Sequence, residues 1–200
     1  MSLPHAVIIA GGKGQRLGGV RKADLRIGGS RLIDRVTSRL GKVAEPLVIS
    51  TGADGLRFVL PQNAVAVPDL DIGCAGPLAG LVAAAVALEN QGVHAGIIVS
   101  VAVDTPFLPT DFVARMMDGL GDASGAYAAW GEDFYPPNAV WRVEGLAERL
   151  MSKSAPTSLK ALQIEIGARR VDWFVPDQPN PFANLNTLED LVSLGTRALP

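Results

Sequence analysis

The chain begins with a short apolar run that leads directly into a glycine-rich turn. In "AVIIAGGKGQRLGGVRK", Ala6 to Lys22, a run of five apolar residues is followed by five glycines and four basic residues. A continuous apolar run of this length is typical of a strand buried on both faces of a parallel sheet. Glycine allows the backbone after such a strand to approach another group closely. The segment therefore predicts a central strand of an α/β fold with a close-approach loop at its carboxyl end.

Strand and helix patterns alternate along the rest of the chain. Further strands are predicted at Pro46–Ser50, Ala64–Val67, Gly96–Val103, Ala126–Trp130, Asn138–Trp141 and Val171–Val175, with residues 131–137 as a turn. Helices are predicted at Leu32–Leu40, Pro77–Gln91, Pro109–Leu120, Glu144–Met151, Ser158–Ile164 and Thr187–Leu199. This alternation favours a mostly parallel sheet in one domain over residues 1–200, since no linker or repeat divides the chain.

Composition excludes several classes of protein. Hydrophobic residues make up 48% of the 200 residues and the net charge is −2, so neither a nucleic-acid-binding nor a membrane-bound protein is expected. Cys74 is the only cysteine, which excludes an internal disulfide framework. The start of the chain lacks a signal-peptide pattern, and a cytoplasmic location is expected. His5 and His94 are interpreted as surface residues, and the tryptophans as core.

The glycine-rich turn matches neither common nucleotide-binding template. A dinucleotide loop needs a third glycine where Leu17 stands, and an ATP-binding P-loop needs a lysine where Val20 stands. What remains is a glycine loop followed by the cations Arg16 and Lys22. Backbone N–H groups and basic side chains together favour phosphate binding. The alternative is a tight turn with solvated charges.

Polar residues that follow other predicted strands offer a second part of a site. Asp104 comes at the end of the strongest strand pattern and is a candidate Mg²⁺ ligand, although an aspartate also commonly caps a turn. Asp69 precedes the glycine-rich helix entry at Gly76, where a plain loop residue is the stronger interpretation. Asn184 and Asn186 flank one leucine, so in an extended segment they project to the same side.

Taken together, these segments resemble the molybdenum cofactor guanylyltransferases. "IIAGGKGQRLGGVRK", "GPLAG", "VAVDTPFLP" and "NLNTLEDL" occur in the order found in that family, and the resemblance spans about Val7 to Leu191. It implies a Rossmann-like, mostly parallel sheet with helices on both faces, of the nucleotide-diphospho-sugar transferase type. It also implies Mg²⁺-dependent transfer of GMP from GTP to the phosphate of molybdopterin, with release of pyrophosphate.

The resemblance also implies roles for individual residues. Arg16, Lys22 and Asp104 are expected in catalysis, with Asp104 as the metal ligand, and Asn184 and Asn186 on the molybdopterin side. The expected nucleotide-binding residues are Ile9, Ala10, Gly11, Gly12, Gly14, Lys22, Ser50, Asp69, Gly76 and Asp104. GTP and molybdopterin are the implied substrates, and other proteins of the molybdenum cofactor pathway are the implied partners.

Other functions stay open at this point. Arg21, Ser50 and Ala102–Val103 depart from the family pattern, in which Asp, Asn and Pro-Cys are common at these positions. One alternative is a cytidylyltransferase that acts on molybdopterin or a related small phosphorylated molecule, against which Gly11–Gly12 argues mildly. A second is a nucleotide-binding regulatory protein without turnover. Transfer to a sugar phosphate is disfavoured, because chains with that activity are generally longer.

Overall fold

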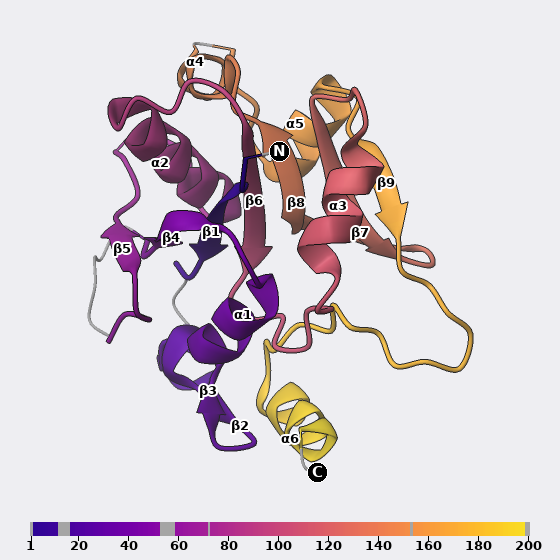
Figure 1. The fold of residues 1–200 in the computed structure, drawn as a ribbon. Coiled ribbons are helices and arrows are strands. Elements are labelled where there is room, and N and C mark those ends of the chain that lie inside the picture. The colour runs from indigo at the N-terminus through magenta and orange to yellow at the C-terminus, as the bar shows by residue number, and fades with distance from the viewer. Residues whose placement is uncertain (1, 12–16, 53–58, 72, 153, 199–200) are drawn as a thin grey trace.

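A seven-stranded sheet forms the centre of the protein (Figure 1). The computed structural model describes residues 2–11, 17–52, 59–71, 73–152 and 154–198. Within them the strands of this sheet are β1 (His5–Ile9), β4 (Ala44–Ser50), β5 (Ala64–Val67), β6 (Ile97–Ala102), β7 (Gly125–Trp130), β8 (Asp133–Arg142) and β9 (Arg169–Asp172). Their order is β5-β4-β1-β6-β8-β7-β9, and β8 alone runs against its neighbours. The prediction of a mostly parallel sheet is confirmed.

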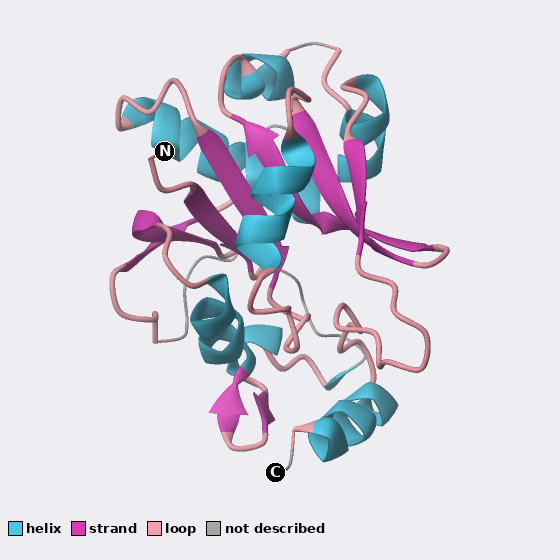
Figure 2. Cartoon of the chain, turned by 45° about the vertical axis from the view of Figure 1, so that its right-hand side comes forward, coloured by secondary structure: helices cyan, strands magenta, loops and turns pink. Residues whose placement is uncertain are grey.

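Helices cover both faces of this sheet, as predicted (Figure 2). Helices α1 (Leu32–Leu40) and α3 (Phe112–Leu120) pack on one face, and α2 (Pro77–Asn90), α4 (Leu146–Met151) and α5 (Leu159–Glu165) pack on the other. The last helix, α6 (Leu188–Arg197), lies below the sheet beside a small hairpin of β2 (Arg26–Ile27) and β3 (Ser30–Arg31) (Figure 1). A single turn of 3₁₀ helix, η2 (Lys22–Asp24), precedes this hairpin.

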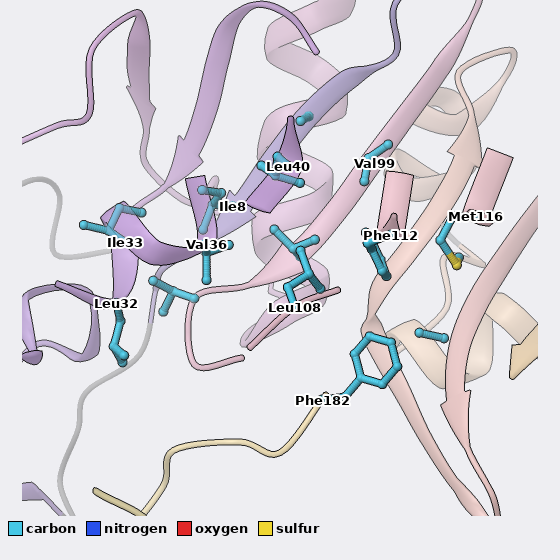
Figure 3. Close-up of a cluster of buried hydrophobic side chains, with 14 of the residues drawn as sticks. Ile8, Leu32, Ile33, Val36, Leu40, Val99, Leu108, Phe112, Met116 and Phe182 are labelled. Atoms are coloured by element: carbon cyan, nitrogen blue, oxygen red, sulfur yellow. The ribbon is translucent and has the colours of Figure 1, made fainter. Parts of the chain in front are cut away.

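Alternate residues of the central strands supply two hydrophobic cores. In β1, Ile8 faces the α1–α3 side while Val7 and Ile9 face the α2 side. Figure 3 shows the first core, in which Ile8 lies among side chains of α1 and Phe112 approaches Phe182 from the C-terminal segment. Strands buried on both faces explain why the apolar runs are continuous instead of alternating with polar residues.

The strand order places a topological switch point between β1 and β6. From β1 the chain proceeds outward to β4 and β5, and then returns through α2 to β6 on the other side of β1. In open α/β sheets, ligands bind outside the carboxyl ends of the strands at such a point. The loops after Ile9 and Ala102 meet there, since the Val103 N–H donates to the Ile9 carbonyl at 3.1 Å.

Strand β8 differs most from its prediction. Residues 131–137 are not one long turn, because β8 already begins at Asp133. The pairing of β7 with β8 jumps from Tyr127–Ala139 to Ala128–Tyr135, so Pro136, Pro137 and Asn138 lie opposite this irregularity. A bulge accommodates proline within a strand because its residues are not needed as ladder donors. A turn was predicted here because paired prolines usually end a strand. The prediction was wrong because the bulge keeps both prolines within β8.

Smaller differences concern the last strand and one of the two histidines. The last predicted strand, Val171–Val175, is displaced, since β9 is Arg169–Asp172. His5 belongs to β1 and is half-buried, with an Nδ1 atom that has no partner among the described residues, so its surface assignment was wrong. His94 is exposed as predicted. Trp141 and Trp173 are core residues as predicted, and Trp130 is partly buried.

Among the described residues, no helix has the length and apolar character needed to cross a membrane.

Candidate functional site

Three polar side chains from distant segments meet at the carboxyl end of β6. The Lys22 Nζ donates to Asp104 Oδ2 at 2.6 Å and to Asn186 Oδ1 at 2.5 Å. The Lys22 and Asp104 side chains retain about a fifth of their surface exposure, so the group is open to a ligand. The predicted lysine, carboxylate and one of the two predicted asparagines are therefore brought together.

Local backbone contacts place Asp104 and Asn186 beside each other. The Leu185 N–H donates to the Asp104 carbonyl at 2.9 Å, and the Leu185 side chain is fully buried while Asn184 and Asn186 on either side are exposed. Asp190 in turn accepts the Asn186 N–H at 2.8 Å. The two asparagines thus lie on the open side of an anchored segment, as the sequence pattern predicted.

The loop after β1 packs directly on the loop after β4. The Ala10 N–H donates to the Ser50 carbonyl at 2.9 Å. A Cβ atom on Gly11 would lie 2.8 Å from the backbone nitrogen of Gly52, which real Cβ contacts do not allow. Glycine is therefore required at position 11 by the close approach of two backbones, whatever ligand the loop binds.

Ser50 and Asp69 form a second polar pair at the same edge of the sheet. The Ser50 hydroxyl donates to Asp69 Oδ1 at 3.2 Å, and Gly80 of α2 leaves the space for Ser50, since a Cβ there would lie 2.6 Å from its oxygen. Burial raises the pKa of Asp69, and the hydrogen bond from Ser50 opposes that rise in part. Asp69 is thus a partly desolvated carboxylate near the carboxyl end of β4.

A cleft of about 380 Å³ opens at the switch point. Its walls come from the ends of β1, β6 and β8, from the start of α2 and from the C-terminal segment. The lining residues are Ile9, Gly11, Lys22, Pro77, Ala102, Val103, Asp104, Phe134, Tyr135, Pro136, Pro137, Asn138 and Asn184. A larger cleft, of about 650 Å³, is lined by residues around Arg142 and α4, beyond the opposite edge of the sheet. Of the predicted site residues, the smaller cleft is lined by Ile9, Gly11, Lys22, Asp104 and Asn184.

The remaining predicted residues fall into two groups. Gly12, Gly14 and Arg16 lie outside the described residues, so their predicted roles stay predictions. Gly76 precedes α2 with a φ of 69°, a left-handed conformation that favours glycine, and Pro77 at the first turn of the helix lines the cleft.

Sequence reasoning missed the wall of the cleft that β8 provides. Tyr135 and Asn138 line the cleft, and the Tyr135 hydroxyl accepts a hydrogen bond from Asn180 Nδ2 at 2.5 Å. The signal was present in "FYPPN", since adjacent prolines within a strand-forming stretch indicate a bulge. Residues 131–137 were interpreted as a turn and Asn138 as the first residue of the next strand, so neither Tyr135 nor Asn138 received a role at the site.

The oxygen atoms around Lys22 are suited to binding a cation. Two oxygens, Asp104 Oδ2 and Asn186 Oδ1, already hold the positive Lys22 Nζ between them. In the part of the chain that the structure describes, no group of three or more His, Cys, Asp or Glu side chains could hold a metal ion. One carboxylate fits an ion such as Mg²⁺, which takes most of its ligands from substrate phosphates and water.

Comparison with known proteins shows the family to which the chain is similar. Residues 6–172 match the MobA-like NTP transferase domain. The chain is 35% identical to a molybdenum cofactor guanylyltransferase from Nitrobacter hamburgensis, over 94% of this chain and 90% of that one. It is 36% identical to a molybdenum cofactor guanylyltransferase from Cereibacter sphaeroides, over 92% of each chain.

A solved structure shares the fold. The molybdopterin-guanine dinucleotide biosynthesis protein A from Archaeoglobus fulgidus superposes with a TM-score of 0.67 at 19% identity, covering 96% of this chain and 97% of that one. Because the domain match covers most of the chain and the relatives align over nearly their full length, the chain belongs to the family of MobA-like NTP transferases.

Proposed function

We propose that this protein transfers GMP from GTP to the phosphate of molybdopterin and releases pyrophosphate. The observation that carries the proposal is the meeting of Lys22, Asp104 and Asn186 beside the β1 loop, at the switch point of the sheet. The two curated relatives described above are named as molybdenum cofactor guanylyltransferases, and they align with more than nine tenths of this chain.

The reaction is a substitution at phosphorus. An oxygen of the acceptor phosphate bonds to the α-phosphorus of GTP, and the bond from that phosphorus to the bridging oxygen breaks, so that pyrophosphate leaves with the electron pair. The acceptor is already an anion at neutral pH, so no strong base is required. This suits a cleft that no histidine lines among the described residues. Catalysis then rests on holding both substrates in line and neutralising charge.

The described residues divide this work between them. Lys22 supplies a positive charge for the phosphates, and it exchanges Asp104 for a phosphate oxygen when the nucleotide binds. Ser50 and Asp69 lie toward β4, where the nucleoside of GTP is proposed to bind. Asn184 and Asn186 are proposed to contact molybdopterin. Arg16 keeps its predicted role at the phosphates.

Mg²⁺ is the proposed cofactor, and Asp104 is the residue that would hold it. When bound, it withdraws charge from the phosphate oxygens and orients them. The fit rests on the oxygen pair around Lys22, which already accommodates a cation, and on the position of Asp104 next to the loop that follows β1.

A pyrophosphate-release assay tests the proposal. Purified protein is mixed with molybdopterin and Mg²⁺, with GTP and CTP offered separately. Release with GTP is expected. Release with CTP alone would identify a cytidylyltransferase instead, and no release with either nucleotide, despite nucleotide binding, would favour the regulatory protein. Chelation of divalent ions is expected to stop the reaction, and turnover that persists in chelator would refute the role of Mg²⁺.

The variant Asp104→Asn probes the metal ligand without changing the size of the side chain. Its turnover number is expected to fall by about two to three orders of magnitude, the usual cost of losing one electrostatic contact in a transition state. Asp122→Asn, in an exposed turn after α3, is the matched control and should retain wild-type turnover. Turnover of Asp104→Asn within a few fold of wild type would contradict the assignment.

A further inference from the structure

A buried amide in the wall of the cleft has only half of its hydrogen bonds. The Asn138 side chain is 1% exposed, and its Oδ1 accepts the Ala102 N–H at 2.9 Å. Its Nδ2 has no partner among the residues that the structure describes. Leaving a buried donor unpaired costs about 1–3 kcal/mol, so native proteins rarely keep one without a reason.

The orientation of this amide follows from its partner. A backbone N–H only donates, so the oxygen of Asn138 must face Ala102 and the amino group must point the other way. Exchanging the two atoms would set two donors against each other. The unpaired group is therefore a hydrogen-bond donor.

The fold explains why an asparagine side chain reaches this place. Regular pairing of β6 with β8 ends at Ser100–Ala139, and the Pro137 carbonyl accepts a hydrogen bond from the Ser100 hydroxyl at 2.8 Å. The Asn138 oxygen takes over the next N–H of β6, two residues before Asp104. Asn138, Ala102 and Asp104 all line the same cleft, so the amide is fixed to the strand that carries the predicted metal ligand.

The order of the strands decides which substrate this donor faces. Apart from Asp104, the predicted nucleotide-binding residues lie in β1, at the end of β4 or in the loops after β1 and β5, on one side of β6, whereas Asn138 lies on β8, on the other side. An in-line transfer needs its two reactants on opposite sides of the reacting phosphorus. With the nucleotide over β1 and β4 and Asp104 after β6, the acceptor lies over β8.

We propose that Asn138 Nδ2 donates a hydrogen bond to an oxygen of the acceptor's phosphate group and holds it for attack. The amino group is covered by protein here, so the contact includes a small rearrangement of the cleft wall when the acceptor binds. Asn138 is then an acceptor-binding residue. This inference rests on the proposed function, because it requires a phosphorylated acceptor.

The variant Asn138→Asp tests the contact. Its shape is unchanged and one oxygen still accepts the Ala102 N–H, but the donor is replaced by an oxygen that repels phosphate. The kcat/KM for molybdopterin is expected to fall about 10- to 100-fold, the range for a hydrogen bond to a charged group. The dissociation constant for GTP, measured by calorimetry with the acceptor absent, should stay within about twofold of wild type.

Two further variants separate recognition from stability. Asn90→Asp makes the same change at an exposed amide at the end of α2, outside the lining of the cleft, and it should keep the wild-type KM for molybdopterin. Asn138→Ser removes the amide without adding charge and should also raise that KM, which covers the case in which Asn138→Asp does not fold. Melting curves establish that the variants compared are folded.

The outcomes distinguish this inference from the function on which it rests. If wild-type protein turns over and folded Asn138 variants keep the wild-type KM for molybdopterin, the inference alone is refuted. An Asn138 variant that weakens GTP binding instead of acceptor binding would also refute it. If wild-type protein releases no pyrophosphate with molybdopterin, the proposed function fails and this inference fails with it.

Discussion

Lys22 contributes little to the stability of the fold, although it makes two short contacts. Both side chains of the Lys22–Asp104 pair are only about a fifth exposed, and for such a pair the cost of removing two charges from water offsets much of their attraction. Holding a long side chain between Asp104 and Asn186 also costs conformational entropy. The arrangement is therefore better explained by binding than by stability, because it keeps a cation, a carboxylate and an amide within reach of one another at the mouth of the cleft.

Asp69 offers a test in which stability and binding change in opposite directions. Burial raises its pKa in the folded protein, so between the unfolded and folded pKa values the folded protein binds more protons. Stability should therefore fall as the pH rises through that window. In Asp69→Asn this fall is expected to be absent, and the melting temperature at pH 7 is expected to exceed that of wild type. Melting curves from pH 3 to 7 measure both effects.

The same variant should bind GTP more weakly, since the proposed nucleoside contact is lost. Asp71→Asn is the control, because Asp71 is exposed in the same loop. A melting temperature of Asp69→Asn below that of wild type at pH 7 would show that the carboxylate stabilises the fold, against this account.

Among the elements, those with strong apolar patterns were predictable. The strand Ala64–Val67 and the start of α2 at Pro77 coincide with their predictions, because continuous apolar runs and a proline at the first helical turn depend only on nearby residues. The bounds predicted for the last strand were displaced from those of β9. β9 is an edge strand whose Arg169 and Arg170 are exposed, so it has no continuous apolar run in the sequence. The extent of β8 depends on a bulge, which propensity does not reveal.

The start of α6 is an element whose energy can be measured. Thr187 accepts the Asp190 N–H at 3.1 Å while Asp190 accepts the Thr187 N–H at 2.8 Å, a complete capping box. Thr187→Ala is expected to lower the free energy of unfolding by about 1 kcal/mol. It should also reduce turnover, because Asp190 additionally holds the Asn186 backbone. Urea denaturation and the pyrophosphate assay measure the two effects.

Thr196→Ala provides the comparison within the same helix. Its hydroxyl donates to the Val192 carbonyl inside α6 and caps nothing, so a loss of less than about 0.5 kcal/mol is expected. Equal losses for the two threonine variants would mean that the box does not stabilise the helix start.

Considered as one molecule, the protein assembles its site from segments that lie far apart in the chain. That Gly11, Asp69 and Asp104 would lie at one edge of the sheet was predictable, because the carboxyl ends of parallel strands point the same way. The contact of Lys22 with Asn186 was not, since it joins residues 164 positions apart through a C-terminal segment without a strand. Asn138 was equally hidden, because its position depends on the bulge.

Removal of residues 184–200 tests this dependence. The truncated chain loses the buried side chains of Leu185 and Leu194, each worth about 2–5 kcal/mol, so a large drop in melting temperature is expected. Turnover should fall below detection. Asn186→Ala in the full chain separates the two causes: it should retain the melting temperature and lose turnover. A truncated protein with wild-type kcat/KM would contradict the assignment of the C-terminal segment to the site.

The hydrogen bond from Leu185 to Asp104 has a consequence for the time at which activity can arise. A ribosome synthesises β1, β6 and the 3₁₀ turn at Lys22 long before it reaches residues 184–186. A single domain generally folds as one unit. Asp104 and Lys22 therefore lack their C-terminal partners until that segment has been made. Competence for the reaction would begin only after residues 184–186 have been made and have packed beside Asp104.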